Sequence, residues 1–237
     1  MSGCATTLPS PPGKAMHLAS PASAGKGNTL VTGAFGGGGE IFGPGAVAGE
    51  LRARHGVTES LDLGVSASAV GLIGENDLNA RPHAGIYALR AFAHHELVPR
   101  FVALHAGVAG GGSAGGGYLS PDLGLTLGYE NPHLVPYIHG TFFVSTPLTK
   151  NTINMTMDDE PLDLRTPYLS YGPQIGGGLR IPIGPREAPV GSILLELGGT
   201  FLFGDDPSDE LDRGLKRSFM TFGAGYQAHF GRRAPRL

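Results

Sequence analysis

The chain has 237 residues, of which 41% are hydrophobic and only 16% are charged, and its net charge is -3. Glycine contributes 40 residues and proline 19, but the glycines follow no three-residue period, which excludes collagen. No apolar run approaches the roughly 20 residues that a transmembrane helix needs. The small negative charge offers no basic surface for nucleic acid, and a single cysteine excludes a disulfide framework.

The first 27 residues differ in composition from those that follow. They are rich in Pro, Ser, Ala, Gly and Thr and show no hydrophobic period, so we expect residues 1–27 to form a flexible tether. The run Met1-Ser-Gly-Cys4 resembles the end of a bacterial lipobox, in which small residues precede a lipidated cysteine. The resemblance implies that Cys4 is a lipid anchor, and Ala5 after it favours sorting to the outer membrane.

From Asn28 onward the dominant period is two. In residues 60–70, apolar side chains at odd positions alternate with Ser, Asp and Gly at even ones, which predicts a strand with one apolar and one polar face. The same alternation is clear at four further places and weaker at five, namely 119–130, 168–183, 192–203 and 219–230, then 29–36, 46–55, 84–93, 100–109 and 135–145. Five apolar residues fall on the polar face: Ile86, Phe92, Phe143, Leu194 and Leu202.

Two features favour a membrane barrel over a soluble sandwich. The polar face carries mostly Gly, Ser and Thr, which suit the crowded interior of a narrow cylinder. The connections also alternate in length, as in outer-membrane barrels, with the long ones expected at 37–45, 71–83, 110–117, 146–167 and 204–217. We therefore predict an all-β fold: a closed antiparallel up-and-down transmembrane β-barrel of about ten strands, with eight or twelve as alternatives, spanning 28–231 and followed by a tail at 232–237.

The last strand, Phe222–Phe230, resembles the aromatic-rich insertion signal of bacterial outer-membrane barrels. Aromatic residues also gather near the expected strand ends, as in the aromatic girdles of that class, among them Tyr87, Tyr118, Phe142, Tyr168, Tyr171, Phe203 and Phe219 at one rim and Phe101, Tyr129, Tyr137 and Phe230 at the other. An even strand number places both termini on one side. The resemblance implies an outer-membrane location with periplasmic N- and C-termini, among outer-membrane lipids and lipopolysaccharide.

The polar face holds the candidate site. Charged residues of both signs face the expected interior, where unpaired charge is costly, so they should form ion pairs. The lining residues expected are Glu50, Arg52, Arg54, Asp62, Arg90, His105, Asp122, Glu130, His139, Gln174, Arg180, Glu196 and His229. The pattern leaves two interpretations open: a plug of ion pairs, or a narrow polar conduit or ligand pocket.

No motif for catalysis, metal or cofactor binding stands out. His94, His95 and Glu96 are adjacent, and neighbouring side chains of a strand point to opposite faces, so a solvated turn is expected there. The acidic runs at 158–160 and 205–212 are expected to be solvated external loops. We predict no catalytic residue, no metal and no cofactor.

The function predicted is a non-enzymatic, lipid-tethered structural or interaction component of the cell envelope, or a narrow pore. Its loops at 146–167 and 204–217 would meet other envelope proteins. Two alternatives stay open. One is an outer-membrane hydrolase with a rim active site, for which His83 is the nearest histidine to the acidic loops. The other is a secreted, soluble β-sandwich adhesin.

Overall fold

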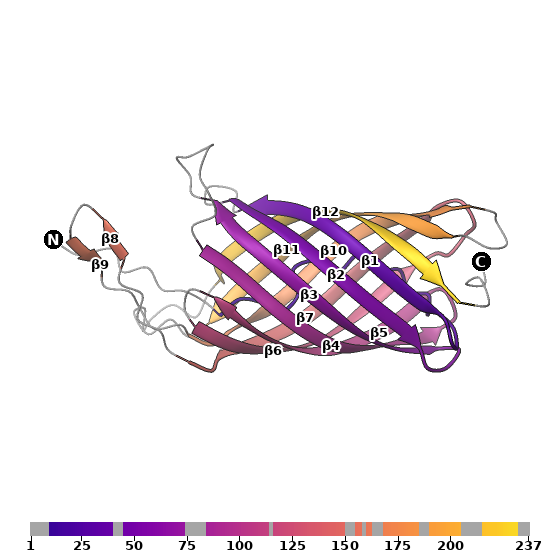
Figure 1. Ribbon diagram of the computed structural model, residues 1–237, viewed down its shortest axis with the longest axis horizontal. Helices are drawn as coiled ribbons and strands as arrows, with labels where there is room; N and C mark the ends of the chain where they lie inside the picture. The colour runs from indigo at the N-terminus through magenta and orange to yellow at the C-terminus, as the bar shows by residue number, and fades with distance from the viewer. Residues whose placement is uncertain are drawn as a thin grey trace.

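The computed structural model describes residues 10–39, 45–73, 84–113, 116–149, 155–157, 160–162, 168–184, 190–204 and 215–231. Within these ranges ten strands form one closed barrel, and β8 (Met155–Met157) pairs with β9 (Glu160–Leu162) in a separate hairpin (Figure 1). The barrel strands are β1 (Thr29–Gly39), β2 (Gly45–Gly56), β3 (Leu61–Ile73), β4 (Ala84–Val98), β5 (Val102–Ser113), β6 (Gly116–Gly128), β7 (Val135–Pro147), β10 (Ser170–Ile183), β11 (Gly191–Gly204) and β12 (Leu215–Phe230). The described part of the chain contains no helix that could cross a membrane.

Closure depends on the pairing of the first strand with the last. β1 pairs with β12 from Thr29 opposite Phe230 to Gly39 opposite Met220, and every other barrel strand pairs with the barrel strands before and after it. All ladders are antiparallel, so the topology is up-and-down. Because each strand has two neighbours, no edge with unpaired backbone groups is left. The closed barrel of ten strands confirms the predicted fold and excludes the sandwich.

The barrel has two rims with different connections. The turn rim holds the short connections at 57–60, 99–101, 129–134 and 184–190, together with the start of β1 and the end of β12. The loop rim holds the connections at 40–44, 74–83, 114–115, 148–169 and 205–214. The long connection predicted at 110–117 is wrong, because β5 continues through its glycines to Ser113 and β6 begins at Gly116.

The apolar residues of the alternating pattern point outward. Each of the ten strands exposes at least one large hydrophobic side chain, and Phe35, Leu89 and Leu197 are each 70% exposed. One such residue per strand traces a ring around the barrel: Phe35, Leu51, Val65, Leu89, Val108, Leu123, Ile138, Ile175, Leu197 and Phe222. Water-soluble monomers rarely expose a continuous apolar surface of this size.

Some aromatic residues of the predicted girdles do not lie on this outer surface. Tyr118, Tyr137 and Tyr168 are buried. On the outer face, Tyr171 stacks on Phe203 with ring centroids 6.1 Å apart, and Phe101 packs edge-on against Tyr129 at 5.7 Å. The girdle pattern is therefore only partly present, because strand parity, and not proximity to a rim, decides which way a side chain points.

The N-terminal segment occupies the inside of the barrel. The sequence predicted a flexible tether over 1–27, but most residues from Ser10 to Ala24 are buried by the surrounding strands. Ser10 donates its N–H to Tyr168 O at the loop rim (3.2 Å), and Gly27 donates to Gly56 O at the turn rim (2.8 Å). The first and last described residues, Ser10 and Gly231, therefore lie at opposite rims, and not on the same side as an even strand count had suggested.

Candidate functional site

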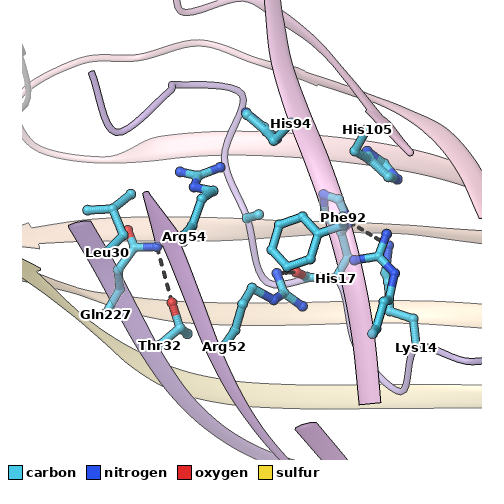
Figure 2. Close-up of a pocket in the computed structure, with 12 residues that line it drawn as sticks. Lys14, His17, Leu30, Thr32, Arg52, Arg54, Phe92, His94, His105 and Gln227 are labelled. Atoms are coloured by element: carbon cyan, nitrogen blue, oxygen red, sulfur yellow. Dashed lines mark hydrogen bonds between the residues drawn. The ribbon is translucent and has the colours of Figure 1, made fainter. Parts of the chain in front are cut away.

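The candidate site is the lumen, formed by the inward faces of the ten strands and the segment between Ser10 and Gly27, which we call the inner segment. All the predicted lining residues are buried except Glu130 and His229, which are half-buried. Figure 2 shows the labelled side chains of several strands converging on the inner segment around Lys14 and His17.

Four arginines of the wall are each paired with a carboxylate of the wall. Arg90 makes two hydrogen bonds of 2.6 Å to Asp122, and Arg54 Nε lies 3.1 Å from Asp62 Oδ2. Arg52 is paired with Glu50, and Arg180 with Glu130. Charge-assisted pairs of this kind satisfy buried groups that would otherwise be costly.

Glu196 is the fifth buried carboxylate of the wall and has no arginine. Its two oxygens accept the backbone N–H groups of His17 (2.9 Å) and Leu18 (2.7 Å). Tyr137 donates its hydroxyl to the same carboxylate (3.3 Å), and His139 Nε2 lies 3.5 Å away. Glu196 thus lies outside the arginine pairs of the wall, and the inner segment binds it.

Lys14 is the buried cation of the inner segment. Its ammonium group donates to His17 Nδ1 (2.7 Å) and to Thr141 Oγ1 (3.2 Å). It forms no ion pair with a carboxylate among the described residues. Because an ammonium group can only donate, His17 Nδ1 accepts, and Nε2 carries the proton that it donates to Thr126 Oγ1 (2.8 Å).

His17 lies at the centre of an aromatic group. Its ring stacks on that of His139 with centroids 4.2 Å apart, and it is tilted against His105 at 4.7 Å. The rings come from three elements, β5, β7 and the inner segment. They fill the middle of the lumen with flat, polar side chains.

Wall side chains satisfy the backbone of the inner segment. Near the loop rim, Ser145 and Ser170 donate to Pro11 O and Ser10 O, and Gln174 donates to Lys14 O (3.0 Å). In the middle, Arg52 donates to Met16 O (3.0 Å) and to His17 O.

The same arrangement continues toward the turn rim. His94 donates to Pro21 O (3.0 Å) and Arg54 to Ala22 O (2.9 Å). Asp62 accepts the N–H of Ala24 with both oxygens, at 3.1 and 2.9 Å. The inner segment is therefore bound from end to end by side chains of strands that are distant in sequence.

Apolar contacts accompany this polar binding. Met16 and Leu18 of the inner segment cluster with Leu194, which points inward from β11 and is fully buried. A Cβ built on Gly223 would lie 2.7 Å from Met16 Sδ, so a side chain there would displace Met16. Leu194 was one of the apolar residues that did not fit the alternating pattern. Its position is explained by the apolar residues of the inner segment.

Phe92 is a second misfit that the structure explains. It points inward, where the guanidinium groups of Arg90 and Arg52 lie 4.7 and 5.8 Å from its ring centroid. Phe143 and Leu202 are also buried on the inner side. Apolar residues on the polar face were the sequence signal that something apolar fills the lumen.

Little space remains in the lumen. The cavity between the inner segment and the wall has a volume of about 20 Å³ and is bordered by Lys14, His17, Ala19, Leu30, Thr32, Arg52, Arg54, Arg90, Phe92, His94, His105 and Gln227 (Figure 2). A single water needs about 10–15 Å³, whereas a small-molecule site occupies roughly 300–1,000 Å³. The structure therefore fits the plug of ion pairs better than the open conduit, and the inner segment is the main component of that plug.

Sequence reasoning missed Lys14, His17 and His94. His94 was expected in a solvated turn, but β4 continues to Val98, so His94 is buried while His95 is exposed. Lys14 and His17 lie in a segment without any period, where only the pairing needs of Glu196 could have pointed to them. Cys4, His83 and the acidic runs at 158–159 and 205–212 lie outside the described residues, within which no group of three or more His, Cys, Asp or Glu is placed to hold a metal ion.

Comparisons with known proteins add likenesses of structure. No protein-family model matches the chain, and a search of curated proteins finds no match. Among solved structures, the chain is similar to an outer membrane channel from Pseudomonas putida F1 (14% identity, TM-score 0.47, covering 86% of this chain and 96% of that one). It is also similar to the beta domain of the Bordetella autotransporter Brka (8%, 0.45, 85% and 98%) and to the outer membrane protease OmpT of Escherichia coli (9%, 0.41, 86% and 97%).

Proposed function

We propose that this protein is a non-enzymatic barrel of the bacterial outer membrane, a structural or interaction component of the cell envelope whose lumen is closed by its own N-terminal segment. The observation that carries this proposal is the ring of exposed apolar side chains, with a contribution from every strand. The strands have 11 to 16 residues, and a tilted strand needs about 9–11 to cross a bilayer. Lipid would cover the ring, and closure would satisfy every backbone group of the ladder.

The lengths of the connections at the two rims support one orientation in the membrane. The longest connections, 74–83, 148–169 and 205–214, leave the loop rim, and outer-membrane barrels carry long loops outside the cell. In the proposed orientation the loop rim faces outward and the turn rim faces the periplasm. Lipopolysaccharide and other envelope proteins would then meet the loop rim.

The interior supports a non-enzymatic role. Hydroxyl groups do lie beside histidines, Thr126 with His17 and Thr141 with His105, which is a pairing that nucleophilic catalysis uses. Both pairs are enclosed by wall and inner segment. The cavity beside them has a volume of about 20 Å³, which is far smaller than a small-molecule site.

Cell fractionation and gel migration test the proposal. We expect the protein in the outer-membrane fraction, extracted only by detergent, and we expect the unheated protein to migrate differently from the boiled protein because the closed barrel resists unfolding. Extraction into aqueous buffer without detergent, with no shift on heating, would contradict it.

A narrow pore is the second candidate function. Four wall arginines are paired with wall carboxylates independently of the inner segment, so these four ion pairs would persist if the inner segment moved out. Glu196 would lose the amides of His17 and Leu18 but keep its contacts with Tyr137 and His139. Planar bilayers test this candidate. The wild-type barrel should conduct no ionic current. Glu196→Gln weakens the binding of the inner segment and should therefore give discrete channel openings. A silent Glu196→Gln barrel would argue for a purely structural role.

A further inference from the structure

The inner segment spans the whole lumen, and its two ends lie at opposite rims. At the loop rim, Ser10 is bound to Tyr168 and Ser170, next to the start of β10. At the turn rim, Gly27 and Asn28 are hydrogen-bonded to Gly56, at the end of β2. The chain therefore passes once through the barrel before β1 begins, and then passes back as the first strand.

The contacts inside are those of a peptide-binding channel. They lie near the loop rim (Gln174 on Lys14 O), in the middle (Glu196 on two successive amides) and near the turn rim (Asp62 on Ala24 N). Most of these bonds reach backbone groups, which every peptide has. The side-chain requirements are few: a cation to balance Glu196, and small or flat residues where the wall approaches closely.

We propose that the lumen is a binding channel for an extended polypeptide, occupied in cis by residues 10–24, and that it presents the chain preceding Ser10 on the loop-rim side of the membrane. The proposal rests on the proposed function, because that side is the outside of the cell only if the barrel spans the outer membrane as described. The proposal is supported by the position of Ser10 at the loop rim and by the cavity of about 20 Å³ beside the inner segment, which is too small for a second pass of chain. This proposal differs from the expectation of a periplasmic N-terminus, because Ser10 lies at the loop rim.

Epitope accessibility in intact cells tests the proposal on the full chain. One variant carries an epitope between Pro9 and Ser10, a second carries it at residues 114–115 of the loop rim, and a third carries it after Gly231 at the turn rim. Each is probed with antibody before and after the outer membrane is permeabilised, and protection of a periplasmic marker is measured in the same cells. Gel migration before and after heating checks that each barrel is folded.

The expected result is that the epitopes before Ser10 and at 114–115 bind antibody in intact cells, whereas the epitope after Gly231 binds only after permeabilisation. If the epitope at 114–115 is exposed but the one before Ser10 is protected, the inference is overturned while the proposed function stands. If all three are protected, or if only the one after Gly231 is exposed, the outward orientation fails as well. Recovery of the protein in a detergent-free soluble fraction would overturn the proposed function itself.

A single-residue version covers the case in which an inserted epitope prevents folding. Thr6→Cys in a Cys4→Ser background leaves one thiol before Ser10, and a membrane-impermeant maleimide should label it in intact cells. Its control, a Cys4→Ser chain with Gly231→Cys, should be labelled only after permeabilisation. Equal protection of both thiols in intact cells would overturn the inference.

Discussion

The barrel strands and the inner segment satisfy their backbone hydrogen-bonding groups in different ways. Each strand satisfies its backbone N–H and C=O groups with those of its two neighbours, in ladders such as β3 with β4. From Ser10 to Ala24 the hydrogen-bond partners of the backbone are nearly all side chains, from residues as different as Ser120, Arg52 and Asp62. A ladder between strands requires only a strand-forming pattern in the sequence. Binding of the inner segment by wall side chains requires a particular residue at each contacting position of the wall.

This difference implies different sensitivities. A substitution on the outside of a strand changes contact with lipid but leaves the ladder intact. A substitution of an inward side chain removes a specific partner of the inner segment and leaves a buried group unsatisfied, which typically costs about 1–3 kcal/mol. Point variants on the two faces of the same strand should therefore separate the two regions.

The largest expected effect is an all-or-none cross-link between the two regions. In a Cys4→Ser background, Met16→Cys with Gly223→Cys should form a disulfide on mild oxidation, because a Cβ at position 223 would lie 3.6 Å from Met16 Cγ. The closed loop should change migration on a non-reducing denaturing gel. The matched control pairs Met16→Cys with Phe222→Cys, whose side chain points outward, and should give no cross-link. Equal cross-linking of both pairs would show that the inner segment is not where we place it.

The next largest effect is expected from paired truncations on β11. Leu194 is fully buried against Met16 and Leu18, whereas its neighbour Leu195 is 42% exposed on the outer face. Leu194→Ala should lower the free energy of unfolding by about 2–5 kcal/mol, the usual cost of a cavity in a packed core. Leu195→Ala should cost much less, because lipid can fill the space. Urea unfolding in lipid vesicles measures both, and equal losses would contradict the asymmetry.

A charge on the outer ring should have an effect of similar size. Leu197 is 70% exposed near the middle of β11, and Leu197→Arg should destabilise the inserted barrel by about 2–4 kcal/mol, the cost found for arginine at a bilayer midplane. Val190→Arg, at the turn rim, should cost only about 0–1 kcal/mol. The measurement is again urea unfolding in vesicles. A Leu197→Arg barrel of wild-type stability would indicate that the ring does not face lipid.

The smallest of these effects is expected from a change of charge inside. Glu196→Gln converts one carboxylate acceptor into an amide that cannot accept from both His17 N and Leu18 N, a loss of about 1.5–3 kcal/mol for bonds to a charged group. Amide hydrogen exchange at Leu18 should speed up while exchange in the strands stays slow. Glu130→Gln, which removes the partner of Arg180 and no described contact to the inner segment, should leave Leu18 protected. Unchanged exchange in Glu196→Gln would mean that the carboxylate does not hold the inner segment.

Much of the barrel could be predicted because period-two alternation is local. The residues on either side of Leu61, Leu123 and Leu195 assign each strand an apolar and a polar face without knowledge of any other strand. Strand ends were harder to predict, since the glycines of 110–117 suit a loop as well as a strand, and a neighbouring ladder decided between them. The turn expected around His94 failed for the same reason: pairing with β3 and β5 continues past it.

The inner segment could not be predicted because it carries no pattern of its own. Its prolines, serines and alanines are compatible with a disordered tether, and its structure depends on partners more than 100 residues away, such as Thr141 for Lys14 and Glu196 for His17. The inward positions of Leu194 and Phe92 were visible in the sequence as exceptions. These exceptions are explained only by the structure, in which the inner segment occupies the lumen.

The sequence by itself determined which side chains face outward and which face inward, because successive side chains of a strand alternate and the chain keeps that alternation through ten strands. Only the tertiary structure decided what the inward side chains bind. Burying charged residues in a closed lumen demands a partner for each, and Glu196 is bound by the segment that precedes the barrel as well as by Tyr137 and His139 of β7. These contacts join residues that are distant in sequence and close in space, so no local sequence pattern predicts them.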